Sequence, residues 1–170
     1  GACLLLSQNL PKYLVPNYGS KGYQIDKERF VRDTALAVRA CDNVFEKTVY
    51  PLERQKKESL DKRRMVVGVT GVANAFEICG NRYASAGYLQ MQDEFLTLQR
   101  DAAYRTSIDM ARVKGSFPLF DADKWLSGPY AQTLPDDIRW GIKKYGLRNG
   151  LLLSIAPTGT ISWAADNVSS

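Results

Sequence analysis

The spacing of apolar residues along the chain predicts helices separated by short strands. Residues 1–10 form an apolar run closed by Asn9 and Pro11, which predicts a strand. Residues 12–23 are rich in Gly, Pro, Asn, Ser and Tyr, and predict a loop. A β-branched run at 65–69 predicts a second short strand.

Apolar residues three and four apart predict the helices. The first helix is capped by Asp26 and puts Phe30, Ala37, Cys41, Val44 and Phe45 on one face. The others are a charged helix from Pro51 to about Lys62, a helix through Ala73, Phe76 and Ile78 ending at Gly80, a long helix from about Gly87 to Lys114 stopped by Gly115, and a helix capped by Thr133 that ends near Gly146. Between the last two, residues 116–123 predict a buried turn. The glycines of Gly68-x-x-Gly71 indicate close backbone packing more than phosphate binding.

The end of the chain carries the clearest chemical pattern. The continuous apolar run Leu151–Ala156 predicts a strand buried on both faces. It leads directly into Pro157–Ser162, a turn with one glycine and three hydroxyl side chains before a possible helix start. Such a turn can point backbone N–H groups at an anion, or its hydroxyls can simply cap the next helix. Spacing alone supports both readings equally.

Composition describes one globular domain and restricts its chemistry. The chain has 170 residues, 45% of them hydrophobic, and a net charge of +5. Residues 47–64 supply +4 of this charge, from seven basic and three acidic residues. This segment predicts a solvated helix face with Glu53–Lys57 and Glu58–Lys62 pairs. Because aromatic residues do not interleave with the charges of residues 53–64, direct nucleic-acid contact is not expected.

Other classes are disfavoured by what the sequence lacks. It contains no histidine, which removes the Ser-His-Asp and Cys-His constellations and most zinc sites, so no metal is expected. Cys3, Cys41 and Cys79 are too widely spaced for a metal motif, and their odd number favours a reducing, cytoplasmic setting over a disulfide framework. No apolar run approaches the ~20 residues of a membrane span. The start at Gly1, without a signal peptide, predicts a chain cut from a larger protein.

Five stretches, in order, resemble the catalytic large subunit of ribonucleotide reductases. They are GACLLLSQNL at 1–10, RRMVVGVTG at 63–71, GLRNG at 146–150, IAPTGTIS at 155–162 and DNVSS at 166–170. Each stretch alone would be weak. Their order and compatible spacing over nearly the whole chain carry the resemblance.

The resemblance implies an α/β fold that is part of a ten-stranded α/β barrel of the ribonucleotide reductase type, helix-rich in this segment. Residues 1–170 would be a partial catalytic barrel domain, incomplete at both ends and without an internal domain boundary. The implied reaction reduces ribonucleotides to 2′-deoxyribonucleotides for DNA synthesis by thiyl-radical chemistry with a redox-active cysteine pair. The radical cysteine and a glutamate belong to an Asn-x-Cys-x-Glu motif, which is absent here and which the family carries upstream of the stretch matching Gly1.

The site residues implied by the resemblance lie at the two ends of the chain. Cys3 matches the second reducing cysteine, although a lone cysteine would otherwise suggest a small core residue. The substrate-phosphate loop matches Pro157, Thr158, Gly159, Thr160, Ile161 and Ser162, with backbone N–H groups and the Thr160 and Ser162 hydroxyls as donors. Arg148 and Asn149 are expected to have a structural part at the strand entry. Cys41 and Cys79 match no functional position and are expected in the core.

The form of the loop is similar to that of the adenosylcobalamin-dependent class and its phage relatives. Adenosylcobalamin is therefore implied for the intact enzyme, with a separate di-iron radical subunit as the alternative, and no cofactor is expected on this segment alone. The implied partners are a ribonucleotide, a thioredoxin- or glutaredoxin-type reductant, and the remainder of the same subunit. Two other hypotheses stay open: a non-catalytic helical module that binds phosphate or nucleic acid through residues 47–64, and a free-standing domain that binds nucleotide without chemistry.

Overall fold

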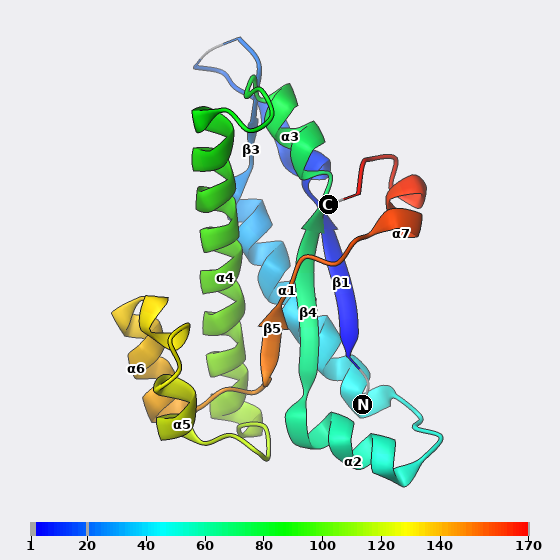
Figure 1. Ribbon diagram of the computed structural model, residues 1–170, viewed down its shortest axis with the longest axis vertical. Helices are drawn as coiled ribbons and strands as arrows, with labels where there is room; N and C mark the ends of the chain where they lie inside the picture. Colours follow the sequence, from blue (N-terminus) through cyan, green and yellow to red (C-terminus); the bar gives the residue numbers. More distant parts are fainter. Residues whose placement is uncertain (1–2, 20, 170) are drawn as a thin grey trace.

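A parallel sheet with helices along its strands organises the chain. The computed structural model describes residues 3–19 and 21–169 (Figure 1). Within them, β1 (Leu4–Asn9), β4 (Arg64–Thr70) and β5 (Leu151–Leu153) form one parallel sheet with β4 in the centre. The β1–β4 register is continuous from Leu4 opposite Met65 to Asn9 opposite Thr70.

The remaining elements connect these strands. Between β1 and β4 lie a 3₁₀ turn (Leu10–Tyr13), the antiparallel hairpin of β2 (Leu14–Pro16) and β3 (Tyr23–Ile25), α1 (Lys27–Lys47) and α2 (Glu53–Lys62). Between β4 and β5 lie α3 (Val72–Ile78), α4 (Ala86–Lys114), α5 (Ala122–Leu126), a 3₁₀ turn (Ala131–Thr133) and α6 (Asp136–Tyr145), while α7 (Gly159–Ala164) follows β5. Each parallel pair is therefore joined by a helical crossover, as parallel pairing requires.

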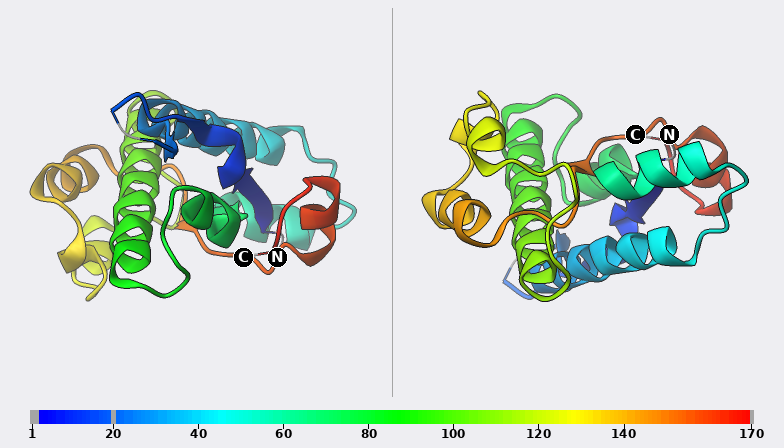
Figure 2. Two further views of the ribbon diagram at one scale, coloured as in Figure 1. Left: turned by 90° about the horizontal axis from the view of Figure 1, so that it is seen from above. Right: turned by 90° about the horizontal axis from the view of Figure 1, so that it is seen from below.

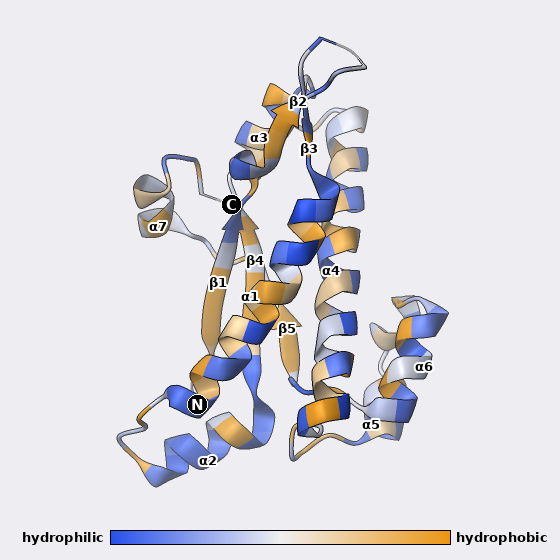
Figure 3. Ribbon diagram, turned by 180° about the vertical axis from the view of Figure 1, so that it is seen from behind, coloured by the Kyte–Doolittle hydropathy of each residue, from blue (hydrophilic) through white to orange (hydrophobic). Residues whose placement is uncertain are grey.

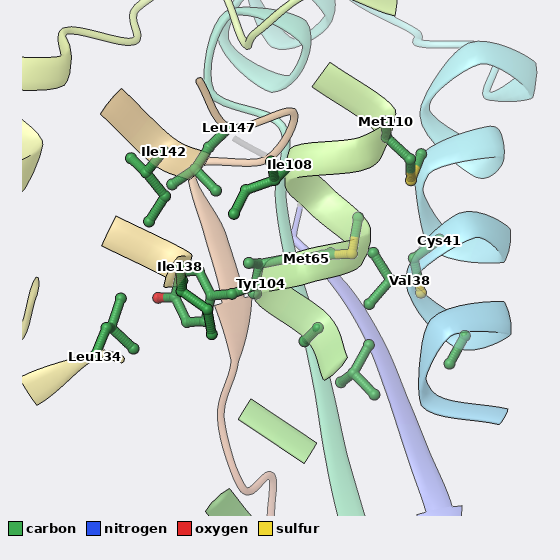
Figure 4. Close-up of a cluster of buried hydrophobic side chains, with 14 of the residues drawn as sticks. Val38, Cys41, Met65, Tyr104, Ile108, Met110, Leu134, Ile138, Ile142 and Leu147 are labelled. Atoms are coloured by element: carbon green, nitrogen blue, oxygen red, sulfur yellow. The ribbon is translucent and has the colours of Figure 1, made fainter. Parts of the chain in front are cut away.

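Two hydrophobic clusters hold the helices to the sheet. The larger joins α1, β4, α4, α6 and β5, and ten of its side chains are labelled in Figure 4. Met65 and Val67 of β4 are fully buried in it, next to Val38 of α1. The smaller cluster contains Phe30, Phe76 and Phe95 at the other end of the sheet. Seen along the long axis, α4 and α7 lie on opposite sides of β1 and β4 (Figure 2).

Local sequence signals placed most of these elements correctly. Asp26 caps α1 and accepts a hydrogen bond from the Arg29 N–H at 2.9 Å. Gly115 ends α4 and Gly146 ends α6, as predicted from glycine at helix ends. The parallel sheet and crossover helices confirm an α/β arrangement; among the described residues, the parallel strands β1, β4 and β5 form one open sheet and not a closed barrel.

Several predictions were wrong in detail. Residues 12–23 are not simply a loop, because they contain β2 and the start of β3. Pro51 precedes the helix instead of opening it, since α2 begins at Glu53. Thr133 lies in a 3₁₀ turn and caps nothing; its hydroxyl donates to the Tyr130 carbonyl, and Pro135 occupies the N-cap of α6.

Burial also departs from the predicted pattern. Val44 on α1 is exposed, unlike the other four residues expected on that face. The turn at 116–123 is only partly buried, with Leu119 exposed. The strand predicted at 151–156 stops at Leu153, and Leu151 and Ile155 are exposed, because no described element covers β5 on its outer face and edge.

Candidate functional site

The face of the sheet opposite α1 forms the floor of the candidate site. Side chains alternate along β1, so Leu4 and Leu6 pack toward the large cluster while Leu5 and Ser7 point the other way. The opposite face pairs Leu5 with Val66, Ser7 with Gly68 and Asn9 with Thr70. Its character changes from apolar to polar toward the carboxyl ends of the strands, where parallel α/β sheets commonly bind ligands.

The chain leaving β5 crosses this face directly over Gly68. A Cβ on Gly68 would lie 2.4 Å from the Ser154 carbonyl oxygen. Figure 1 shows the segment passing in front of β4 on its way to α7. The prediction that this glycine serves close backbone packing is confirmed, and the contact brings Pro157–Ser162 to β1.

A cavity of about 300 Å³ lies between β1 and this loop. Its walls are Leu5, Leu6 and Ser7 on one side and residues 156–161 on the other. The volume is at the lower end of the range for small-molecule sites, about 300 to 1,000 Å³. Strand residues and loop residues that are about 150 positions apart in the sequence thus line the same cavity.

The loop enters α7 through an unusual backbone conformation. Thr158, the N-cap of α7, has a φ of 54°, in the left-handed region that a β-branched residue rarely adopts. Gly159, Thr160 and Ile161 are exposed and form the first turn of α7, whose amide groups have no earlier helical carbonyl to bond. These amides and the Thr160 hydroxyl are available to an anion.

Not every predicted donor is available. The Ser162 side chain is buried, and its hydroxyl donates to the Gly159 carbonyl oxygen at 2.8 Å. Thr158 is also buried, with its hydroxyl oxygen 3.2 Å from that of Thr70. The exposed hydroxyl of this turn is therefore that of Thr160.

Sequence reasoning missed the residues beneath the loop. Asn9 and Thr70 end their strands, and both contact the chain around α7. The Asn9 Nδ2 donates to the Ala165 carbonyl at 3.0 Å, and the Asn9 Oδ1 accepts from the Asn167 Nδ2 at 2.8 Å. Thr70 contacts Thr158 and Asn167, both at 3.2 Å. The position of polar residues at the ends of two parallel strands was the available signal.

Cys3 lies at the opposite end of β1 from the loop. It directly precedes the strand, is exposed, and carries a free thiol. Ser7 is four positions further along the chain, or about 13 Å along an extended strand. The structure therefore places the two predicted site elements at different points along one strand.

The other cysteines have surroundings of another kind. Cys41 is buried in the large cluster, and burial together with the neighbouring Cys3 thiol raises its pKa. Cys79 is partly buried against the smaller cluster, and burial raises its pKa too. A raised pKa keeps a thiol protonated and poorly nucleophilic, which agrees with the predicted packing role of both.

A buried ion cluster holds the amino ends of β4 and β5. The fully buried Asp42 of α1 accepts from the Arg63 guanidinium at 2.6 Å, from the Asn149 Nδ2 at 3.1 Å and from the Lys114 Nζ at 3.2 Å. The Arg148 Nε lies 3.3 Å from the same carboxylate. The expected structural part of Arg148 and Asn149 is confirmed. Burial alone would raise the pKa of Asp42, but the hydrogen bonds and positive charge of Arg63 and Arg148 outweigh it, so the pKa lies below its usual value.

The charged segment at 47–64 is only partly a solvated face. Lys62 pairs with Glu58 at 2.7 Å as predicted. The predicted Glu53–Lys57 pair was wrong, because Lys57 pairs with Asp61 at 2.6 Å and Glu53 with Lys56 at 3.7 Å. Figure 3 shows α2 as mostly hydrophilic, with one apolar position in its second half. Arg63, however, is buried and ion-paired, because the chain turns there into β4 through a left-handed residue. Its charge is thus not presented to a nucleic acid.

Comparison with known proteins defines the class to which this arrangement belongs. The model of the ribonucleotide reductase barrel domain matches residues 1–170. The chain belongs to this family. A ribonucleoside-diphosphate reductase subunit alpha from Treponema pallidum is 30% identical over 75% of this chain and 16% of its own length.

Relatives with a stated cofactor dependence are also similar. A vitamin B12-dependent ribonucleoside-diphosphate reductase from Thermoplasma acidophilum is 30% identical over 95% of this chain and 18% of its own length. A protein of the same description from Mycobacterium tuberculosis is 27% identical, over 96% of this chain and 20% of its own length. The chain spans about a fifth or less of the length of these relatives.

Two features are absent from the described residues. No helix among them is long and apolar enough to cross a membrane. Within residues 3–19 and 21–169, no group of three or more His, Cys, Asp or Glu side chains is arranged to hold a metal ion.

Proposed function

We propose that this chain is part of a ribonucleotide reductase catalytic subunit, which reduces ribonucleotides to 2′-deoxyribonucleotides for DNA synthesis. The observation that carries the proposal is the cavity between β1 and Pro157–Ser162. It joins the two segments that match the family's reducing-cysteine strand and phosphate loop. The family match over the whole chain supports the same assignment.

The loop would bind the substrate phosphates. The first-turn amides of α7 and the Thr160 hydroxyl supply hydrogen-bond donors without a lysine, and bonds from such donors to a charged acceptor are stronger than neutral ones. With the phosphates held at the carboxyl end of β1, the ribose would extend along the strand toward Cys3. The cavity floor of Leu5 and Ser7 lies between the two.

Cys3 would be one of two reducing thiols, with its partner in the remainder of the subunit. In the net reaction the two thiols lose two electrons and two protons and form a disulfide. The 2′ carbon–oxygen bond breaks, the hydroxyl leaves as water, and a carbon–hydrogen bond forms at the same carbon. An exposed thiol suits this role, because a thioredoxin- or glutaredoxin-type protein must then reach the pair to reduce it again.

For the radical source we propose adenosylcobalamin, with a separate di-iron radical subunit as the alternative. Vitamin B12-dependent relatives support the first. The cavity beside the loop, at about 300 Å³, does not fit so large a macrocycle. The cofactor would supply the radical that the cysteine chemistry requires, and none of the roles assigned to this chain passes through it.

The redox role is tested by Cys3→Ser in a full-length subunit that carries this sequence. We expect steady-state turnover with an external dithiol system to stop, because a serine hydroxyl cannot form a disulfide. Cys79→Ser is the matched control, since it changes a partly buried cysteine in another cluster. Steady-state turnover by the Cys3 variant at the control's rate would exclude the redox role.

The phosphate role is tested by Thr160→Ala and Thr160→Ser in the same protein. Loss of one charge-assisted hydrogen bond should raise KM for the nucleotide about tenfold in the alanine variant. The serine variant keeps the hydroxyl and should bind as the unchanged enzyme does. Equal KM values for the two variants would count against a hydroxyl contact at Thr160.

A further inference from the structure

We propose that Thr70 is a positioning residue for the phosphate loop. Its hydroxyl contacts both flanks of α7 and so fixes the turn in which the phosphate donors lie. The inference rests on the proposed function of Pro157–Ser162 and adds a residue from β4 that lies outside the loop.

The hydrogen-bonding groups around Thr70 can be assigned as donors or acceptors. The Thr70 Oγ1 lies 3.2 Å from the Thr158 Oγ1, the Asn167 Oδ1 and the Val168 carbonyl oxygen. The last two are oxygens that only accept, whereas a threonine hydroxyl has one proton to donate. Thr70 therefore shares its proton between them and accepts the proton of Thr158.

This assignment separates support from contact within the loop. On this assignment, the Thr158 hydroxyl donates to Thr70. Thr70 thus acts on the loop through the buried Thr158, while Thr160 remains exposed. Both threonines belong to the same matching stretch, yet their hydroxyls have different tasks.

The conformation of α7 shows why such support is needed. The helix has only six residues, too few to be stable by itself, and left-handed residues stand on either side of it: Thr158 at φ 54° and Asp166 at φ 53°. Non-glycine residues in this region persist only when their surroundings hold them. Thr70 bonds directly to Thr158 and to Asn167, the neighbour of Asp166.

A second contact reinforces the same arrangement. Asn9 stands opposite Thr70 in the β1–β4 register and bonds to Ala165 and Asn167. The Asn167 side chain thereby spans the two strand ends, since its Nδ2 donates to Asn9 while its Oδ1 accepts from Thr70. The side chains that hold α7 in place thus belong to Asn9 and Thr70, the last residue pair of the β1–β4 ladder.

The test compares Thr70→Val with Thr70→Ser in the full-length subunit. Valine has nearly the same shape but no hydroxyl, so the loop should lose its preferred geometry and KM for the nucleotide should rise about fivefold to tenfold, with kcat little changed. Serine should restore KM. Thr106→Val is the matched control, because Thr106 is also buried and donates a hydrogen bond, at 2.7 Å to Ala102, but lies within α4.

A double-mutant cycle with Thr158→Val tests the route of the effect. If Thr70 acts through Thr158, the KM increase of the double variant should be smaller than the product of the two single increases. The Thr158 variant also removes the bond from the loop side if Thr70→Val fails to fold. Multiplicative effects, an unchanged KM in both single variants, or an equal increase in the Thr106 control would overturn the positioning role.

The phosphate role of the loop and the positioning role of Thr70 can be tested separately. If Thr160→Ala raises KM while Thr70→Val does not, the phosphate loop stands and the positioning role is wrong. If neither changes KM in an active enzyme, the proposed function of the loop is wrong as well.

Discussion

The two ends of the parallel sheet are held by different kinds of contact. At the amino ends of β4 and β5, the buried Asp42 carboxylate binds two guanidinium groups, an ammonium and an amide. At the carboxyl ends of β1 and β4, the contacts are made by neutral amides and hydroxyls. The same sheet is therefore fastened by charge at one end and by uncharged hydrogen bonds at the other. The candidate phosphate loop lies at the uncharged end.

The two kinds of contact suit different tasks: the ion cluster stabilises the fold, and the neutral hydrogen bonds support the candidate loop. A buried ion cluster has a high desolvation cost, so removing one member leaves charges unpaired and affects the whole fold. Neutral hydrogen bonds can exchange partners at a smaller cost when a ligand arrives. The placement also keeps the Asp42 carboxylate at the far end of the strands from the candidate phosphate loop.

Asp42→Asn should have the largest effect on stability. It removes the buried carboxylate that Arg63 and Arg148 share and leaves Glu46 as their remaining ion-pair partner, so the free energy of unfolding should fall by about 3 kcal/mol. Urea unfolding of the full-length protein measures it, with the exposed Asp109→Asn as the control. A loss no larger than that of the control would mean that the charges at this end are not coupled to the fold.

Acid should act on the same end. The folded-state pKa of Asp42 is depressed, so its contribution is fully present above the unfolded value of about 3.9 and is lost as pH falls through the folded pKa. Unfolding free energy should therefore decline more steeply below about pH 4 in the unchanged protein than in Asp42→Asn. Parallel pH profiles for the two proteins would contradict this.

Gly68→Ala should have an intermediate effect on stability, and it should also affect the candidate loop at the carboxyl ends of β1 and β4. The new methyl group would stand 2.4 Å from the Ser154 carbonyl oxygen, so the crossing segment must move. We expect a loss of about 1–3 kcal/mol in the free energy of unfolding and a higher nucleotide KM. Gly128→Ala, where the nearest atom is at 3.4 Å, should change KM little.

Asn9→Ala should disturb the carboxyl end alone. Two neutral hydrogen bonds are lost, worth about 1–2 kcal/mol, and the effect should appear as faster amide hydrogen exchange in α7. Exchange at the amino ends of β4 and β5 should stay the same. Equal acceleration at both ends would show that they are not independent.

Lys57→Ala should have the smallest effect. Its pair with Asp61 is exposed on α2, near the charged end of the sheet, and such pairs contribute at most about 0.5 kcal/mol. Thermal unfolding should shift by a degree or so at most, as expected for a change that small. A large shift in the unfolding temperature would show that exposed charge pairs, and not the buried ion cluster, stabilise the amino ends of β4 and β5.

The sequence predicted features that depend on neighbouring residues and missed those that depend on distant ones. Asp26 and Gly115 act within one helical turn, so the ends of α1 and α4 could be placed from local chemistry. Arg63 looked like part of a solvated charge run, because its partner Asp42 is 21 positions away and only the fold brings them together.

The candidate site shows the same division. Residues 157–162 could be predicted because a strand, a glycine and hydroxyl side chains adjoin in sequence. The support from Asn9 and Thr70 could not, since it depends on the β1–β4 register and on the path of the chain after β5. The strand at 151–156 was overestimated, because its apolar run indicates burial that the described elements do not provide.

The contact at Gly68 has a consequence for how this sequence can diverge. Where two side chains meet, a larger residue on one side can be matched by a smaller one on the other, so the pair can change over generations. Here the opposing atom is the carbonyl oxygen of Ser154, and no substitution can make a backbone atom smaller. Gly150 faces the Lys62 carbonyl in the same way, with a Cβ position 2.5 Å from the oxygen. Both positions have no compensating mutation available, and related sequences should retain glycine at them even where the surrounding core has been replaced.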